Sequence, residues 1–189
     1  MPEGDPLRYI TLVAQNAPNS HRLTCSCSVH HLPELGALLR ACVHDGASVG
    51  FVLPYSVEES EAFWSGKVLP SLRASALVLF VARHGEAIAG TVQLDYDTMP
   101  NQRHRAEVRK LLVHPSFRRQ GIAKALMAEL EHRAHQLQRS LLTLDTRTGD
   151  KAEPLYAALG YQTAGVIPQF CRDTLEERLD STTIMYKML

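Results

Sequence analysis

The chain has 189 residues, of which 20 are Lys or Arg and 20 are Asp or Glu, so its formal net charge is zero. This balance speaks against a dedicated nucleic-acid binder and against a polybasic membrane-surface protein, because both need an excess of cations. Hydrophobic residues make up 45% and charged residues 21%, as is typical of a soluble globular domain. The longest wholly apolar run, residues 76–82, is far shorter than the roughly 20 residues that span a bilayer. The first residues lack the basic and apolar regions of a signal peptide, so we expect a cytoplasmic protein.

The cysteines and histidines form no recognisable metal-binding pattern. The four cysteines are Cys25, Cys27, Cys42 and Cys171. They contain no CxxC pair, and we expect them to be reduced thiols. His132 and His135 share a predicted helix face, but no HExxH motif or carboxylate completes a ligand set. We therefore expect no metal site.

The amino-terminal part is expected to be less regular than the rest. Residues 1–20 are rich in Pro and turn-forming residues and predict a flexible extension, with at most one short strand over residues 8–14. A single domain is expected over residues 21–189, beginning with a short strand over residues 21–27.

Two helices are expected next along the chain. Residues 35–43 carry apolar side chains at helical spacing and are followed by Asp45-Gly46, a C-terminal cap signal. Ser56 and Glu59 form a capping-box pattern that predicts the start of a second helix. The inner side of that helix is expected to carry Ala62, Phe63 and Leu69.

The remaining pattern predicts a sheet. The expected strands are 76–83, 86–95, 106–113, 141–145, 161–167 and 182–188. The first two flank His84-Gly85, a two-residue hairpin connection. An amphipathic helix over residues 119–139 joins the third and fourth strands into a βαβ unit, whose strands should run parallel. A short helix over residues 152–159 has Pro154 in its first turn and is followed by Gly160, a C-terminal cap residue. We predict a single α/β domain with a mixed sheet of about six to seven strands and flanking helices.

The junction between the strand at 106–113 and the following helix has the composition of an anion-binding loop. Its backbone N–H groups and the helix dipole would attract an anion, and Gly121 and Ala123 would let a phosphate approach closely. Arg118, Arg119 and Lys124 add positive charge around the same point. These features predict phosphate binding, and a solvated basic turn is the alternative.

Two motifs indicate a family. Arg-x-x-Gly-x-Ala after a strand ending in Val-x-Pro resembles the pyrophosphate loop of the GNAT superfamily of N-acetyltransferases, which binds acetyl-coenzyme A (acetyl-CoA). The stretch at residues 153–161, with Leu155-Tyr156 followed by Gly160-Tyr161, resembles the second hallmark of that family, a helix of LYxxxGF type. The resemblance implies a splayed pair of parallel strands and a set of acetyl-CoA-binding residues. These are Leu111, Leu112, Val113, Arg118, Arg119, Gln120, Gly121, Ile122, Ala123 and Lys124.

A narrower resemblance, to acetyltransferases of the tabtoxin-resistance type, runs from about residue 21 to Leu189. It is carried by residues 44–51, 105–108, 110–113, 144–146 and 184–187. By family description such an enzyme acetylates a β-lactam amino-acid toxin.

Two carboxylates are candidates for removing a proton from the acceptor amine. A primary amine has a pKa of about 10, so a base must help to deprotonate it. Glu107 lies on the cofactor strand and Asp145 ends the next parallel strand, and both match carboxylates proposed for this step in the tabtoxin-resistance type. The alternatives are structural: an ion pair of Glu107 with Arg105 or Arg109, and a turn cap at Asp145.

The resemblance also assigns roles around the thioester. The hydroxyl of Tyr156 would donate a proton to the coenzyme A sulfur, and a packed core tyrosine is the alternative. Backbone N–H groups near Leu112–Val113 would polarise the carbonyl at a bulge. Gly149 stands where the family often has Asn, so that Thr148 or Asp150 would have to substitute for one contact.

Taken together, these patterns predict an acetyl-CoA-dependent N-acetyltransferase that acts on a small-molecule amine by direct attack in a ternary complex, and an amino-acid-like toxin or antibiotic is the candidate acceptor. The alternatives are a peptide or protein N-acetyltransferase and a non-catalytic acyl-CoA-binding module. The expected partners are acetyl-CoA and the small amine, with no nucleic acid and no membrane, and the expected state is a monomer or a homodimer.

Overall fold

The computed structural model describes residues 8–12 and 31–189. Its strands are β1 (Arg8–Leu12), β2 (Leu77–His84), β3 (Ala87–Asp95), β4 (Arg105–Val113), β5 (Leu141–Arg147), β6 (Gln162–Arg172) and β7 (Leu179–Met188). Its α-helices are α2 (Leu32–His44), α3 (Val57–Phe63), α4 (Leu69–Arg73), α5 (Ile122–Gln136) and α6 (Ala152–Ala158).

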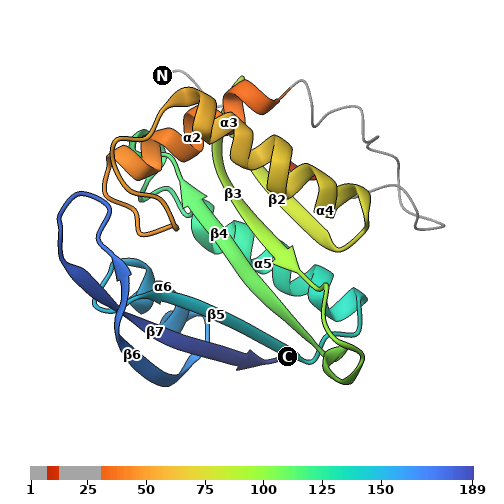
Figure 1. The fold of residues 1–189 in the computed structure, drawn as a ribbon. Helices are drawn as coiled ribbons and strands as arrows, with labels where there is room; N and C mark the ends of the chain where they lie inside the picture. The colour runs from red at the N-terminus through yellow and green to blue at the C-terminus, as the bar shows by residue number, and fades with distance from the viewer. Residues whose placement is uncertain (1–7, 13–30) are drawn as a thin grey trace.

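The strands form one seven-stranded sheet in the order β1-β2-β3-β4-β5-β7-β6. Each neighbouring pair is antiparallel except β4 and β5, which run parallel because α5 returns the chain between them. Figure 1 shows β4 and β5 side by side at one end and separated at the other. The predicted mixed α/β sheet with one parallel pair is confirmed.

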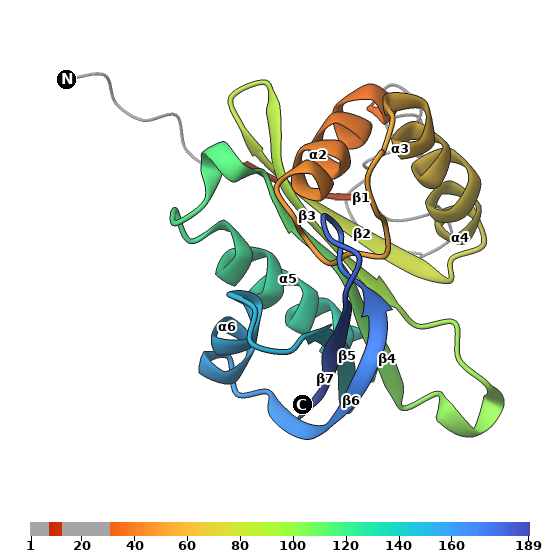
Figure 2. The same ribbon diagram turned by 60° about the vertical axis from the view of Figure 1, so that its left-hand side comes forward.

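Helices cover both faces of this sheet and divide the core into two clusters (Figure 2). Helices α5 and α6 pack on one face, where Leu126, Met127 and Leu130 are fully buried against the strands. Helices α2, α3 and α4 pack on the other face with Leu39 and Trp64. Because β2 and β3 lie between the two clusters, their central residues are buried on both sides.

The strand expected over residues 8–14 is present as β1, which pairs antiparallel with β2 from Arg8↔Arg83 to Leu12↔Leu79. This segment therefore belongs to the sheet, although it precedes the domain start expected at residue 21. The strand expected over residues 21–27, with Cys25 and Cys27, lies outside the described residues.

The capping box at the start of α3 is confirmed, because the Ser56 side chain accepts from the Glu59 N–H and the Glu59 side chain accepts from the Ser56 N–H. The helix continues through a π-helical segment, Trp64–Val68, into α4. The buried residues of this segment are Trp64 and Val68. Ala62, predicted on the inner side, is exposed.

Several predicted boundaries shift by a few residues. The β2–β3 turn consists of Gly85-Glu86 rather than His84-Gly85, since His84 pairs with Ala87. Helix α5 begins at Ile122 and ends at Gln136, inside the predicted range of 119–139. Its first turn lies close to β3, where a Cβ on Gly90 would come within 3.1 Å of Ile122 Cγ2 and within 2.7 Å of the Leu112 carbonyl oxygen of β4. Only glycine fits this approach without displacing the backbone.

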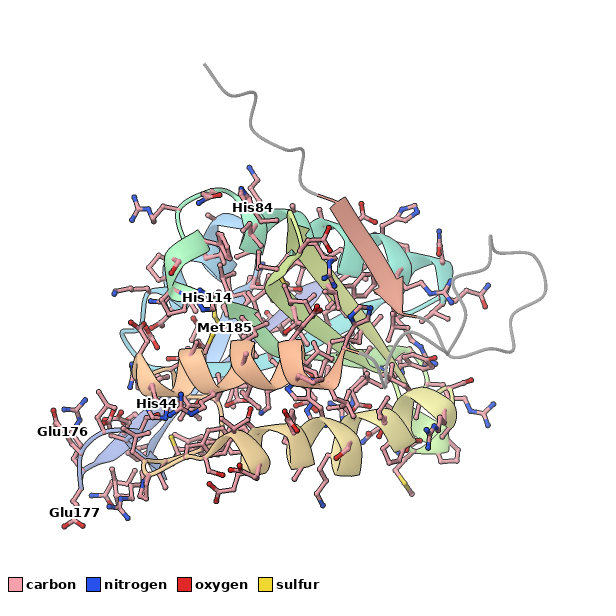
Figure 3. The ribbon with its side chains drawn as sticks, turned by 90° about the horizontal axis from the view of Figure 1, so that it is seen from above. His44, His84, His114, Glu176, Glu177 and Met185 are labelled. Atoms are coloured by element: carbon pink, nitrogen blue, oxygen red, sulfur yellow. The ribbon has the colours of Figure 1, made fainter. Side chains whose placement is uncertain are left out.

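The two carboxyl-terminal strands are longer than predicted and form a hairpin whose connecting loop reaches the α2–α3 loop. Thr174 accepts a hydrogen bond from the Leu53 N–H through its backbone oxygen and donates its hydroxyl to the Ala47 oxygen at 2.9 Å. Figure 3 shows Glu176 and Glu177 at the tip of this hairpin, on the side of the molecule where α2 ends at His44. The hairpin thus brings the loop between β6 and β7 beside the α2–α3 loop.

Candidate functional site

The site predicted from the sequence lies where β4 and β5 separate. The two strands pair in register only from Arg105↔Leu141 to Glu107↔Thr143. Beyond this point β4 stays paired with β3, and β5 stays paired with β7. The sheet is therefore split between its two parallel strands. Beyond Glu107 and Thr143, the facing edges of β4 and β5 do not pair with each other. This is the splayed parallel pair that the family resemblance predicted.

A β-bulge interrupts β4 along this split. The register passes from Gln93↔Arg109 to Thr91↔Leu112, so that Lys110 and Leu111 together oppose one residue of β3. Lys110 has a left-handed backbone with φ of 50°. The predicted bulge is present, but it lies just before the Leu112–Val113 position where the polarising N–H groups were expected.

The loop between β4 and α5 exposes a run of backbone donors. The first α5 N–H to find a backbone acceptor is that of Ala125, which donates to Gly121 at 3.0 Å. The N–H groups of residues 119–124 make no backbone hydrogen bond within the described residues. Arg119 and Gly121 have left-handed φ values of 65° and 80°. Consecutive N–H groups in such a turn form a concave nest for an anion, here at the N-terminus of a helix.

The side chains of the loop between β4 and α5 differ in how freely they could contact a ligand. Arg118 pairs with Asp45 at the end of α2, so its charge is partly neutralised. Arg119, Gln120 and Lys124 are exposed. The other predicted cofactor-binding residues are apolar or small: Leu112 and Ile122 are buried, and Leu111, Val113 and Ala123 are half-buried. This arrangement suits recognition by backbone donors, with side-chain cations at the rim.

The two candidate carboxylates lie on the same face of the sheet. Ala106, Val108, Leu142 and Leu144 point into the cluster beneath α5, so Glu107 and Asp145 face the opposite side. Glu107 is the register partner of Thr143, and Asp145 is the next residue of β5 on that face. They are diagonal neighbours at the start of the split.

Their contacts leave both carboxylates accessible. The Glu107 side chain is 45% exposed and lies 4.0 Å from the Arg109 guanidinium, which forms its closer ion pair with Asp95 at 2.7 Å. The alternative of a Glu107–Arg109 ion pair is thus present, at the 4.0 Å limit for such a pair. Asp145 is exposed and accepts a weak hydrogen bond from the Thr182 hydroxyl at 3.3 Å.

Tyr156 projects from α6 into the core cluster beneath α5. Its ring makes an edge contact with Tyr161 at a centroid distance of 5.7 Å, and the side chain is buried. Burial, followed by the negative charges of Asp145 and Asp150, raises the pKa of its hydroxyl above the usual value. The phenol is therefore a neutral hydrogen-bond donor over the whole physiological range. Thr148 and Asp150, the possible substitutes for the family Asn, bond to Thr183 and Arg147 instead.

Sequence reasoning did not single out Lys110. Its ammonium group lies 5.8 Å and 5.6 Å from the ring centroids of Phe51 and Phe63 on the α2–α3 side of the sheet. Desolvation, followed by the charge of Arg109, lowers its pKa, while Asp145 and Glu107 oppose this effect. The bulge that places it here depends on the pairing of β3 with β4, which no local sequence signal encodes.

Comparison with known proteins identifies the family to which this arrangement belongs. The profile of the acetyltransferase (GNAT) family matches residues 51–161, which include the bulge, the anion-binding loop, both carboxylates and Tyr156. The chain belongs to the GNAT acetyltransferase family. This membership makes it an acyltransferase by family.

Solved GNAT structures share the fold at low sequence identity. A phosphinothricin acetyltransferase from Sinorhizobium meliloti in complex with acetyl-CoA is 21% identical, with a TM-score of 0.69 over 85% of this chain and 84% of that chain. An N-acetyltransferase from Staphylococcus aureus Mu50 is 15% identical, with a TM-score of 0.72 over 96% and 98% of the two chains. A ribosomal-protein-alanine N-acetyltransferase from Brucella melitensis is 20% identical, with a TM-score of 0.68 over 85% and 95%. At these identities the similarity establishes the GNAT fold.

Within residues 8–12 and 31–189, no helix combines the length and the apolar character that crossing a membrane requires.

Proposed function

We propose that this GNAT protein is an acetyl-CoA-dependent N-acetyltransferase that acetylates a small amine by direct attack in a ternary complex. The observation that carries this proposal is the run of unpaired N–H groups at residues 119–124 beside the split between β4 and β5. The pyrophosphate of acetyl-CoA would sit on this run, because it offers several donors and the positive end of a helix dipole.

The two unpaired strand edges suit the pantetheine arm of the co-substrate. An amide-containing chain between the edges of β4 and β5 can exchange backbone hydrogen bonds with them. The thioester would then reach the carboxylates at the start of the split. Backbone N–H groups at the Lys110–Leu111 bulge are the proposed donors to its carbonyl oxygen, one to two residues earlier than the sequence suggested.

Glu107 and Asp145 are the proposed acceptors of the amine proton. The amine nitrogen attacks the thioester carbonyl carbon, a C–N bond forms, and the C–S bond then breaks to release the thiolate. One carboxylate or a water molecule held by it takes the proton that the nitrogen loses. Their position on one face supports a shared role, and the exposure of both leaves room for the acceptor.

Tyr156 is the proposed proton donor to the departing thiolate. Its raised pKa keeps the hydroxyl protonated, so it is ready to donate when charge develops on sulfur. A covalent acetyl-cysteine route is less well supported. Cys171 lies 3.6 Å from the Ser48 hydroxyl with no histidine beside it in the sequence, and burial raises the pKa of Cys42 to about 11.

The proposed acceptor is a small amine of amino-acid type, such as a toxin or an antibiotic. The phosphinothricin acetyltransferase among the solved structures and the resemblance to the tabtoxin-resistance type support this choice. We also propose that the protein is cytoplasmic and works as a monomer or a homodimer, without a nucleic-acid or membrane partner.

The test is acetyl-CoA-dependent thiol release with a panel of acceptors. The panel contains amino acids, their primary amides, simple alkylamines and short peptides with free amino termini, each assayed against hydrolysis without acceptor. We expect turnover with small amines above that background. Turnover with peptides alone would favour a peptide N-acetyltransferase. Stabilisation by acetyl-CoA with no turnover for any amine would favour a non-catalytic acyl-CoA-binding module.

A further inference from the structure

We propose that Lys110 forms an anion-binding subsite beside the carboxylates, and that the acceptor is an amine that also carries a carboxylate or a similar anionic group. This inference rests on the proposed function. It adds a second feature of the acceptor, an anionic group beside the reacting amine. It is carried by the position of Lys110, by the absence of a carboxylate partner for it within the described residues, and by its aromatic surroundings.

The bulge in β4 turns the Lys110 side chain toward the α2–α3 side of the sheet. Lys110 carries a left-handed φ of 50°, an unusual conformation for a residue with a long side chain. Its ammonium lies over Phe51 and Phe63, and a Cβ on Gly50 would come within 3.7 Å of it. The α2–α3 loop and α3 therefore enclose it from one side.

The charges around Lys110 do not pair with it. Among the described residues, no carboxylate oxygen lies within the 4.0 Å ion-pair distance of its ammonium. The charges of Asp145 and Glu107 raise the pKa of Lys110, and the charge of Arg109 lowers it. Arg109 is paired with Asp95, and Arg105 on the same face donates to Gln102 and Thr143, whereas the Lys110 ammonium has neither an ion pair nor a side-chain hydrogen bond within the described residues.

An anionic ligand would lower the free energy of the Lys110 ammonium group in this position. The ammonium is partly desolvated, and burying a cation without a counter-ion costs free energy. The two aromatic rings favour the charged form but satisfy none of its three N–H donors. A carboxylate would supply both the opposite charge and the acceptors, and a charge-assisted pair of this kind is stronger than a neutral hydrogen bond.

A second unsatisfied donor lies beside the bulge. Gln93 is the register partner of Arg109, and it lies on the same sheet face because Val92 and Leu94 point to the opposite cluster. Its side chain is buried, and its amide nitrogen has no hydrogen-bond partner among the described residues. A buried amide donor without a partner is costly, so a bound acceptor oxygen or a water attached to it would satisfy this group.

The arrangement matches a zwitterionic acceptor. Glu107 and Asp145 would face the amine, and Lys110 would face the carboxylate of the ligand, because the charges of both protein carboxylates act on Lys110. A molecule that carries both an amine and a carboxylate can present one charge to Glu107 and Asp145 and the other to Lys110. A simple alkylamine would leave Lys110 unpaired and would gain nothing from it.

The experiment compares matched acceptors with two variants. Each L-amino acid is assayed beside its primary amide and the corresponding decarboxylated amine, with saturating acetyl-CoA. Lys110→Met removes the charge but keeps an unbranched side chain against Phe51 and Phe63, and Lys110→Arg keeps the charge. Lys67→Met, an exposed lysine on the π-helical segment, is the matched control.

We expect Lys110→Met to raise KM for amino acids by about ten- to a hundredfold, the usual effect of losing a hydrogen bond to a charged group. KM for acetyl-CoA and the melting temperature should change little, and KM for decarboxylated amines should rise much less than KM for amino acids. Lys110→Arg should keep much of the preference for carboxylate-bearing acceptors that Lys110→Met loses. An equal loss for amides, alkylamines and amino acids would overturn the inference, because it would show a structural effect.

Binding of a carboxylate without an amine separates this inference from the proposed function. The probes are α-hydroxy acids, titrated by calorimetry into the wild-type protein and Lys110→Met, each loaded with coenzyme A. Binding that depends on Lys110 supports the subsite even if no amine is acetylated. Acetylation of alkylamines with no preference for carboxylates, and no Lys110-dependent binding, overturns the subsite and leaves the N-acetyltransferase proposal intact.

Discussion

Tyr156 shows how the environment of one residue sets its protonation state. Its hydroxyl is buried near two carboxylates, so its pKa is raised and the proton stays on oxygen at neutral pH. Tyr161, its aromatic neighbour, is similarly buried. The two phenols are alike in burial, which makes Tyr161 a useful control.

Tyr156→Phe is expected to lower kcat by about 10²–10⁴-fold, the usual range for lost general acid catalysis. KM for acetyl-CoA should change little, because a donor to the leaving thiolate acts mainly in the transition state. Steady-state kinetics with acetyl-CoA varied will check this, with Tyr161→Phe retaining nearly wild-type kcat. Unchanged turnover in Tyr156→Phe would mean that the ring serves packing alone.

Glu107→Gln and Asp145→Asn are expected each to depress activity most at low pH, where the acceptor amine is chiefly protonated. The double variant should lose less than the product of the single losses, since groups that act on one proton are not independent. The pH profile of kcat/KM measures this, and Glu129→Gln on the exposed side of α5 is the control. Fully multiplicative losses, or weaker acetyl-CoA binding in both single variants, would favour structural roles.

At the scale of the element, we expect acetyl-CoA binding by the loop before α5 to depend on backbone conformation more than on side chains. Gly121 has a left-handed φ of 80°, and a Cβ there would meet no atom within 4 Å. A substitution therefore strains the backbone without a clash. Gly85, in the β2–β3 turn, has a φ of 57° and equally open surroundings, but it lies away from the N–H run.

Gly121→Val and Gly85→Val should each destabilise the protein, by about 1–2 kcal/mol for the left-handed conformation. Only Gly121→Val should weaken acetyl-CoA binding strongly, because it displaces the donors of residues 119–124. Calorimetric titration with acetyl-CoA, together with thermal unfolding, compares the two. Equal affinity in both variants would remove the phosphate assignment from this loop.

At the scale of the whole molecule, several buried acids tie stability to pH. Burial raises the pKa of Cys42 from 9.0 to about 11 and that of Tyr55 from 10.0 to about 12, and it also raises the pKa values of Tyr156 and Tyr161. Each group holds its proton more tightly when folded. Its contribution is complete below the unfolded pKa and is lost as pH rises toward the folded pKa.

The free energy of unfolding should therefore fall between about pH 9 and pH 12, with Cys42 alone accounting for about 1 kcal/mol of the loss at pH 10. Urea unfolding at pH 7.5 and pH 10 measures this difference. Cys42→Ala should reduce the loss by that amount, whatever its effect on stability at pH 7.5. A loss of the same size in wild type and Cys42→Ala would show that the thiol does not contribute.

Local patterns were sufficient for most elements of the fold. The capping box at Ser56, the cap at Gly160 and the amphipathic stripe of α5 depend on neighbours within a few residues, so the sequence alone predicts them. The same holds for the order of strand, loop and helix around Gly121, which carries the family motif. The π-helical segment Trp64–Val68, whose Trp64 and Val68 are buried in the core, was not predicted in this way, and neither was the exposure of Ala62.

The amino-acid sequence by itself determined the α/β class, the parallel pair and the order of strand, loop and helix around the loop that we propose binds an anion, because these follow from periodicity and from chemistry within one stretch of chain. Only the tertiary structure decided where β4 and β5 part, that Glu107 and Asp145 share one face, and that the bulge turns Lys110 toward Phe51 and Phe63. These features depend on the register between strands and on side chains far apart in sequence. Strand register is fixed by the packing of both sheet faces together, which no single segment of the chain specifies.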